Sequence, residues 1–234
     1  MLSYQKGVVK TSVRHLVEFL FRGGDITTGS SVSASPEAML EGSRLHRKIQ
    51  RGQKATYQSE VPLKMEWQGE GDDLVLEGRA DGIDKTEVNK DRLSDVDGMN
   101  QTESDEEKLQ HVIGMNQIES NEEKLTYVDE IKCVYRDVEE IEEADILHLA
   151  QAKCYAAIYG SEQKLGVISV QMTYCNLETE EIRRFVQEFS VKELKSWFDE
   201  LTEQYCKWCE MQVRWKKCRQ KSIHTCEFPF SYRE

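Results

Sequence analysis

The sequence predicts an α/β fold in which a mixed β-sheet is flanked by helices. Three observations support this prediction: helical spacing near the N-terminus, short segments rich in β-branched residues in the middle, and a charged amphipathic stretch near the C-terminal end. Their alternation along the chain is typical of a layered sheet-and-helix domain. The expected helices cover residues 12–21, 36–51 and 144–159, and one or two further helices are expected within residues 180–215. The expected strands cover residues 57–65, 74–83, 125–134 and 167–175.

Local signals mark the ends of the expected helices. Ser12 can cap the first helix, in which apolar residues recur at helical spacing, and two glycines follow at positions 23 and 24. Pro36 suits the first turn of the second helix, because that position needs no amide hydrogen bond. The third helix is rich in good helix formers and is expected to close at Gly160.

The charge of the chain is acidic but unevenly distributed. The 234 residues carry a formal net charge of −12, and residues 82–129 alone hold 13 acidic and 5 basic residues. That segment has a net charge of −8, which leaves −4 for the rest and makes a basic groove compatible with the composition. The sequence has no apolar run of membrane-spanning length and no secretory signal, so we expect a cytoplasmic protein with no membrane partner.

Three consecutive 16-residue units begin at Gly82, Gly98 and Gly114. The second and third units are nearly identical, and the first is a diverged copy. One unit would form a hairpin between two strands, and further copies lengthen that connection at little closure cost. We interpret this insertion, at about residues 82–129, as a mobile acidic loop, and an extended hairpin or helical arm is the alternative.

Residues suited to metal chemistry lie at the two ends of this insertion. Glu130 and Lys132 are two positions apart in a strand-like segment, so their side chains project from the same face. Asp81 ends the apolar strand that precedes the insertion, and the hairpin would place it beside Glu130. Two carboxylates at neighbouring strand ends form an oxygen-rich site suited to Mg²⁺ or Mn²⁺.

Four short motifs occur in a fixed order around this pair of carboxylates: Gly42-x-x-x-His46, Gly78-Arg-Ala-Asp81, Glu130-x-Lys132 and Gln151-x-x-x-Tyr155. Together they resemble the RecB-type branch of the PD-(D/E)xK nuclease superfamily. Ala80 replaces the proline that usually precedes the aspartate. The resemblance covers about residues 41–175 outside the insertion, and it implies a restriction-endonuclease-like fold.

The resemblance also implies a metal site. Asp81, Glu130 and the backbone carbonyl of Ile131 would hold Mg²⁺ or Mn²⁺, and His46 would supply a further ligand. Glu60, on the preceding expected strand, is a candidate support for the metal, although an exposed strand glutamate would look the same.

Further residues would act on the phosphate. The resemblance implies that Lys132 orients or deprotonates the attacking water, helped by a lowered lysine pKa on burial. Gln151 and Tyr155, four positions apart on a helix, share one face and would contact the phosphate backbone or fix Lys132. Four basic residues flanking His46 are candidate phosphate contacts, although a solvated helix face explains them almost as well: Arg44, Arg47, Lys48 and Arg51.

Four of the seven cysteines crowd the C-terminal end. Some RecB-type nucleases bind an iron-sulfur cluster with three late cysteines and one that precedes the core. Cys206, Cys209 and Cys218 match the late group, but no cysteine precedes Cys133, so Cys226 would have to be the fourth ligand. A zinc site and a packed amphipathic helix with incidental thiols are the alternatives.

Residues 219–234 end in an aromatic-proline-aromatic pattern that looks like the segment before the motor domain of DinG-type DNA helicases. No ATPase phosphate-binding loop occurs in the sequence. We therefore expect a nuclease domain over residues 1–218 and a tail at 219–234 that is a candidate linker to a helicase domain.

The predicted function is a divalent-metal-dependent DNA nuclease, acting as an exonuclease or on single strands in DNA repair or processing. The alternative is a non-cleaving DNA-binding module of the same fold that serves a helicase partner. The intact set of Asp81, Glu130 and Lys132 favours the enzyme.

Overall fold

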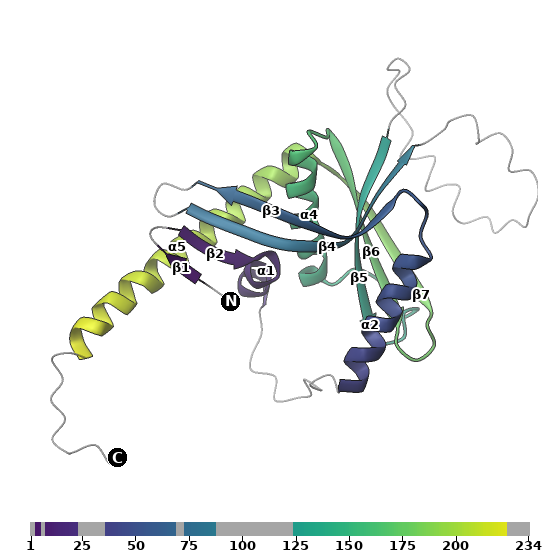
Figure 1. Ribbon diagram of the computed structural model, residues 1–234, viewed down its shortest axis with the longest axis horizontal. Coiled ribbons are helices and arrows are strands. Elements are labelled where there is room, and N and C mark those ends of the chain that lie inside the picture. Colours follow the sequence, from purple (N-terminus) through teal and green to yellow (C-terminus); the bar gives the residue numbers. More distant parts are fainter. Residues whose placement is uncertain (1–2, 6–7, 23–35, 69–72, 88–123, 224–234) are drawn as a thin grey trace, which may run out of the picture.

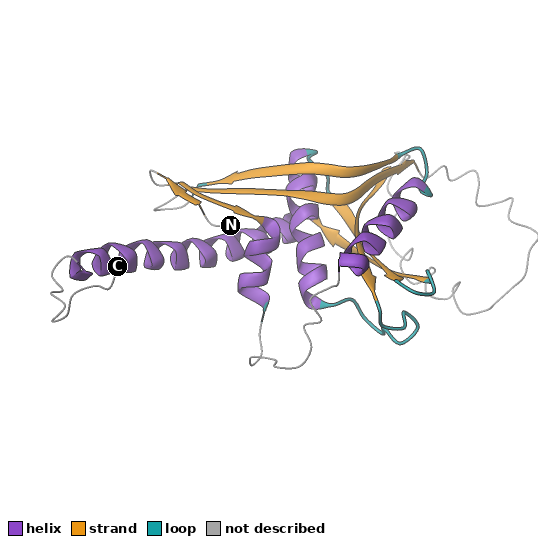
Figure 2. Ribbon diagram, turned by 60° about the horizontal axis from the view of Figure 1, so that its bottom comes forward, coloured by secondary structure: helices purple, strands orange, loops and turns teal. Residues whose placement is uncertain are grey.

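A computed structural model of the chain describes residues 3–5, 8–22, 36–68, 73–87 and 124–223. A seven-stranded mixed sheet runs through the molecule, with helices packed against it (Figures 1 and 2). The predicted α/β class, a mixed sheet flanked by helices, is confirmed. Among the described residues, every helix is too short or too polar to cross a membrane.

The sheet contains parallel and antiparallel neighbours in the order β1-β2-β4-β5-β6-β7, and β3 pairs with β4. The strands are β1 (Ser3–Gln5), β2 (Val8–Ser12), β3 (Tyr57–Trp67), β4 (Asp73–Glu87), β5 (Lys124–Val134), β6 (Val167–Asn176) and β7 (Ile182–Ser190). The helices are α1 (Val13–Phe21), α2 (Pro36–Arg51), α4 (Ile146–Glu162) and α5 (Val191–Ile223). Only the pairs β2–β4 and β5–β6 are parallel among the described strands.

Strand β4 changes its neighbour along one edge. Its first part, Asp73–Glu77, pairs with β2, and its last part, Gly82–Glu87, pairs with β5. The other edge pairs with β3. Beyond Asp129, β5 pairs with β6 alone among the described strands, so β4 and β5 diverge. We call this divergence, formed by residues 78–81 and 130–132, the β4–β5 fork.

The ends of the predicted insertion belong to the sheet. Gly82, which starts the first repeat unit, pairs with Asp129, which ends the third. The antiparallel pairing predicted for these two strands is therefore confirmed, and it continues to Glu87 and Lys124. Residues 88–123, on which the loop interpretation depends, lie outside the described residues.

Two expectations about helix ends have different outcomes. Ser12 caps α1 as predicted, because its hydroxyl accepts a hydrogen bond from the His15 amide at 3.1 Å. Gly160 does not close α4, which continues to Glu162. A Cβ atom at this glycine would lie 2.8 Å from Val191 Cγ2, so Gly160 permits the close approach of α4 and α5.

The prediction of helix throughout residues 180–215 is wrong in its first part, which forms strand β7. Phe185 and Phe189 pack against the main core, while the side chains between them are exposed. These two phenylalanines are four positions apart, a spacing that fits one face of a strand as well as one face of a helix, so the periodicity did not separate the two structures. The short strands β1 and β2 were also missed.

Two apolar clusters hold the layers together. The larger one joins the sheet to α1, α4 and α5 and includes Leu16, Leu76 and Phe198. The smaller one fixes α2 on β5 and β6 through Leu45, Ile49, Ile131 and Cys175. Helix α2 is therefore held by a small contact beside the β4–β5 fork.

Leucine substitutions test this assignment of the core. Leu194 on α5 is 2% exposed and Leu40 on α2 is 72% exposed. Leu194→Ala leaves a cavity, so we expect the free energy of unfolding to fall by about 2–5 kcal/mol. The matched Leu40→Ala should change it by less than about 0.5 kcal/mol. Urea unfolding followed by circular dichroism measures both values, and equal losses would contradict the assigned core.

Candidate functional site

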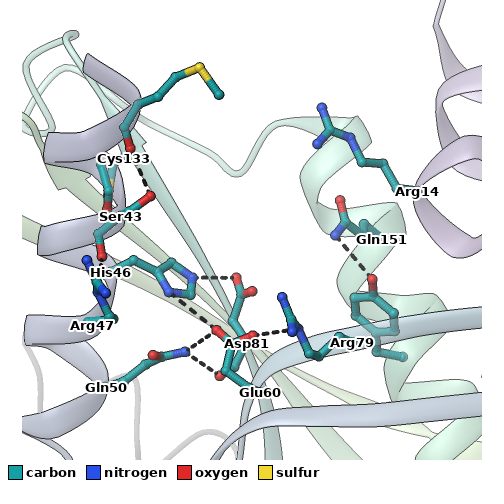
Figure 3. Close-up of a pocket in the computed structure, with 13 residues that line it drawn as sticks. Arg14, Ser43, His46, Arg47, Gln50, Glu60, Arg79, Asp81, Cys133 and Gln151 are labelled. Carbon is teal, nitrogen blue, oxygen red and sulfur yellow. Dashed lines mark hydrogen bonds and ion pairs between the residues drawn. The ribbon is translucent and has the colours of Figure 1, made fainter. Parts of the chain in front are cut away.

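An open cavity of about 910 Å³ lies over the β4–β5 fork. Helix α2 forms one wall, α1 and α4 form the opposite wall, and β3 and β4 lie at the base (Figure 3). Polar side chains enter it from every side: His46, Arg47 and Gln50 from α2, Glu60, Arg79 and Asp81 from the strands, and Arg14, Gln151 and Tyr155 from the opposite wall.

Three of these side chains could hold one cation, and we call His46, Glu60 and Asp81 the His-Glu-Asp cluster. Their ligand atoms all lie within 4.8 Å of one another. His46 Nε2 is 3.2 Å from Asp81 Oδ2, and His46 Nδ1 is 3.7 Å from Glu60 Oε1. Two carboxylates with one imidazole are donors that Mg²⁺ and Mn²⁺ accept.

Glu60 has a backbone conformation that is uncommon for its residue type. Its φ angle is 56°, in the left-handed region that few residues other than glycine adopt. It lies opposite Asp81, where the ladder between β3 and β4 is interrupted. Backbone strain of this kind persists only where surrounding contacts hold it, and it is concentrated at functional sites.

Neighbouring side chains hold the Glu60 carboxylate in place. Arg79 Nε lies 2.5 Å from Glu60 Oε2, and Gln50 Nε2 donates to Glu60 Oε1 at 2.9 Å. The same Gln50 nitrogen also donates to the backbone oxygen of Asp81 at 2.9 Å. Gln50 thus ties helix α2 to both strands at the base of the cavity.

Side chains of the site satisfy backbone groups where the strands separate. Asp81 Oδ2 accepts a hydrogen bond from the Ile131 amide at 2.7 Å, across the fork. The Tyr155 hydroxyl is hydrogen-bonded to the backbone of Arg79. A Cβ atom at Gly78 would lie 2.6 Å from Tyr155 Cε1, so the glycine is needed for the tyrosine to approach β4.

Glu130 is the most buried charged group of the site, with 1% of its surface exposed. Its Oε1 accepts a hydrogen bond from Lys132 Nζ at 2.6 Å. Its Oε2 has no hydrogen-bond partner among the described residues. Burial, and then the nearby charge of Asp81, raise the pKa of Glu130 to about 8. A buried carboxylate oxygen without a partner is a group that a bound cation would stabilise.

The acidic surroundings also act on the histidine. The hydrogen bond with Asp81 raises the pKa of His46, and burial opposes this effect. The charges of Glu60 and Glu130 act in the same direction as Asp81. These carboxylates favour the protonated imidazole, and a metal ion bound by His46 would compete with that proton.

The predicted helix face on α4 is present. Gln151 Nε2 donates to the Tyr155 hydroxyl at 3.4 Å, and both residues line the cavity. Half-buried His148, one turn before Gln151, lies with Nδ1 3.2 Å from the Tyr174 hydroxyl. Burial, and then the charge of Lys132, lower the pKa of His148.

Of the four basic residues predicted at the mouth of the site, Arg47 alone is among the cavity-lining residues. Its Nε donates to the Ser43 backbone oxygen at 3.0 Å. Arg44 and Lys48 instead contact Glu180 in the turn between β6 and β7.

Across the cavity from Arg47 lies Arg14 (Figure 3). Its Nε is 2.8 Å from Glu18 Oε1 in an exposed pair. Arg14 and Arg47 therefore place one guanidinium on each wall of the cavity.

The structure brings most of the predicted site together. His46, Asp81, Gln151 and Tyr155 share one cavity, and Glu130 and Lys132 lie on the other arm of the fork. Ile131 contributes its amide to Asp81, while its side chain packs under α2.

Four residues of the site were missed from the sequence. Gln50 lies four positions after His46 and His148 three positions before Gln151, so helical spacing could have indicated both. Arg79 lies inside the motif that contains Asp81. Arg14 carries no local signal, because only tertiary packing brings α1 to the cavity.

The late cysteines are not gathered at one point. Cys206 and Cys209 are buried in the main core, and Cys218 is exposed on the same helix. Cys218 lies nine positions after Cys209 on the helix, or about 13 Å along its axis. Cys226 lies outside the described residues. The described part of α5 thus presents packed or isolated thiols, and the iron-sulfur expectation remains a prediction.

A scan against models of known protein families finds no match, and a search of curated proteins also finds none. Among solved structures, the chain is similar to the crystal structure of SSO0001, with a TM-score of 0.47 and 16% sequence identity. That similarity covers 88% of this chain and 78% of the other.

A pH titration tests the contact between His46 and Asp81. We expect the His46 imidazole to titrate above its ordinary value of 6.5 in the wild type, and at a lower pH in Asp81→Asn. The contact between His46 and Asp81 stabilises the fold fully below the pKa that His46 has in the unfolded chain. This stabilisation is lost as the pH rises through the pKa of His46 in the folded protein. Mg²⁺ should lower the titration midpoint, because imidazole binds metal only when neutral. Proton NMR of the histidine resonances measures each midpoint, and an identical midpoint in Asp81→Asn would contradict the pairing.

A second test concerns the cost of burying Glu130. Because the folded pKa of Glu130 is raised above its unfolded value, the fold loses stability as the pH rises from about 4.5 to about 8, where the unfolded chain releases the proton that the folded protein retains. Glu130→Gln removes the charge without creating a cavity, so we expect its unfolding midpoint at pH 7.5 to exceed that of the wild type by at least about 2 °C. At pH 4 the difference should vanish. Thermal scans without metal measure it, and a destabilised variant at both pH values would contradict the assignment.

Proposed function

We propose that the chain is a divalent-metal-dependent nuclease of the RecB-type PD-(D/E)xK class, with a restriction-endonuclease-like fold. One observation carries the proposal. Glu130, buried with an unpartnered oxygen, and Lys132, 2.6 Å away, lie on one arm of the β4–β5 fork, and Asp81 lies on the other. Two carboxylates and a lysine on diverging strands supply metal ligands and a cation at one place.

The residues present fit a Mg²⁺ or Mn²⁺ ion. The resemblance assigns the ion to Asp81, Glu130, His46 and the backbone carbonyl of Ile131. The ligand atoms that lie within 4.8 Å of one another belong to His46, Asp81 and Glu60, so Glu60 would be a ligand beside the first two. The unpartnered Glu130 oxygen and the close carboxylate of Asp81 would both gain from a cation. When bound, such an ion lowers the pKa of a coordinated water and polarises a phosphate.

The side chains around the ion would complete phosphodiester hydrolysis. Lys132 would hydrogen-bond the attacking water and a phosphate oxygen, as the ammonium is only partly buried. Gln151 and Tyr155 would hold the phosphate backbone from α4. The water oxygen bonds to phosphorus, the bond to one ester oxygen breaks, and the proton passes to that leaving oxygen.

The proposed substrate is DNA, as single strands or ends, in repair or processing in the cytoplasm, with a helicase domain as a candidate partner. Arg14 and Arg47 support a phosphate-containing substrate, because they face the cavity from opposite walls. A strand between them would meet one guanidinium on each side of the scissile phosphate.

Substitutions at the fork test the activity. Asp81→Asn, Glu130→Gln and Lys132→Gln should each reduce Mg²⁺- or Mn²⁺-dependent cleavage at least about 100-fold, because each removes a metal ligand or the lysine at the water. Lys64 and Glu66 provide a matched control, since they form an exposed strand pair with the same two-residue spacing and a 2.9 Å contact. Lys64→Gln and Glu66→Gln should retain full activity.

The assay uses end-labelled single- and double-stranded DNA with Mg²⁺, Mn²⁺ or EDTA. Cleavage that survives EDTA, or full activity of Glu130→Gln, would refute the metal nuclease. Metal-independent DNA binding by the wild type without cleavage of either substrate would instead support the non-cleaving module.

A further inference from the structure

The second half of helix α5 extends past the packed core. Cys209 is its last buried residue among the described part of the chain, yet the helix continues to Ile223. This end of α5 projects away from the rest of the fold (Figures 1 and 2). Its helical conformation therefore gains little from core packing. One face, which includes Lys216 and Lys217, lines a cavity of about 320 Å³ beside Val9 of β2, whereas Trp215 is not among the residues of that cavity.

This projecting part is cationic in an otherwise acidic chain. Between Glu210 and Ser222 it holds five basic residues and one acidic residue, while the whole chain has a net charge of −12. All five are exposed and none forms an ion pair with a described residue: Arg214, Lys216, Lys217, Arg219 and Lys221. In the first part of α5, by contrast, Lys195 and Lys207 pair with carboxylates.

The helix dipole does not account for this arrangement. Cations are favourable in the last turn of a helix, but the effect fades within that turn, so it covers Lys221 and not Arg214. Arg214 with Lys217, and Lys217 with Lys221, are like charges at helical neighbour positions, which destabilises an isolated helix. An anionic partner would remove this repulsion.

Aromatic side chains line the helix beside these cations. Trp208, Met211 and Trp215 recur at helical spacing, and Phe19 of α1 extends the row, with its ring centroid 4.2 Å from that of Trp208. We call these four residues, three aromatic side chains and one methionine, the aromatic stripe. Trp215 is 54% exposed, and the Arg219 guanidinium lies 5.3 Å from its ring centroid. The stripe is too narrow to be a membrane-inserting face, because Met211 and Trp215 are the only exposed large apolar side chains of the projecting part for which the structure describes exposure.

We propose that the aromatic stripe and the cations of the projecting part of α5 bind single-stranded nucleic acid. The exposed face of Trp215 offers a stacking platform to a base, and Arg214 and Arg219 neutralise adjacent phosphates. A single strand supplies both unstacked bases and anionic phosphates, whereas duplex DNA hides its base faces. This surface lies outside the cavity at the fork, and its binding does not require cleavage or metal.

Fluorescence anisotropy tests the proposal with the full chain, a labelled oligothymidine of about 20 nucleotides and EDTA. Because base stacking contributes about 1–3 kcal/mol, Trp215→Ala should weaken binding about 5- to 150-fold, and Trp215→Phe should restore most of the affinity. The double variant Arg214→Gln/Arg219→Gln should reduce the slope of log affinity against log salt by about 1.4. Tyr135→Ala, which removes an exposed aromatic elsewhere, and Lys192→Gln/Lys195→Gln, on the first part of α5, should leave binding unchanged.

Several outcomes would overturn the proposal. Unchanged affinity in both the tryptophan and arginine variants would remove it, as would an equal effect of Trp215→Ala on a duplex of the same length. Trp215-dependent self-association in sedimentation, or Trp215-dependent binding to phosphatidylserine vesicles, without oligothymidine binding would assign the stripe to another partner. If the wild-type protein binds oligothymidine through Trp215 but cleaves no DNA, the proposed nuclease activity is refuted and the binding surface is not, because the binding assay contains no metal.

Discussion

Backbone groups that lose a strand partner must find another, and this constraint organises the site. At the β4–β5 fork the Ile131 amide donates a hydrogen bond to the Asp81 carboxylate, and the backbone of Arg79 is hydrogen-bonded to the Tyr155 hydroxyl. Unsatisfied buried backbone groups are costly, so these side chains stabilise the separation of the strands. The same separation opens the space in which carboxylates from two strands meet. Fold stability and the proposed chemistry therefore depend on one set of hydrogen bonds.

The site also retains features that oppose stability. Glu130 is buried with one unpartnered oxygen, Glu60 has a left-handed backbone, and His46 is held among carboxylates. A fold optimised for stability alone would replace such groups, and proteins commonly keep them where function requires them. The stabilisation that offsets these unfavourable groups comes from packing around α4. The small residues of this helix allow the sheet, α1 and α5 to approach it closely.

The sequence predicted the parts of this arrangement that depend on local spacing. Glu130 and Lys132 lie two positions apart on a strand, and Gln151 and Tyr155 four apart on a helix, so their shared faces follow from backbone geometry. The other parts of the site depend on how strands that are distant in the sequence pair with one another. Glu60 could be named from the sequence as a candidate, but its place beside His46 and Asp81 requires the register of β3 on β4 and an unusual φ angle, which no local pattern encodes.

The pairing of Gly82 with Asp129 has an evolutionary consequence. These residues are the outer limits of a segment made of whole 16-residue units, so a gene that gains or loses one unit by replication slippage conserves both paired ends. From Gly82 and Asp129 to Glu87 and Lys124 the two paired strands extend for about 20 Å, and they separate the fork from the remaining residues of the repeats, 88–123. Repeat number can thus change by whole units with little effect on the geometry of the fork.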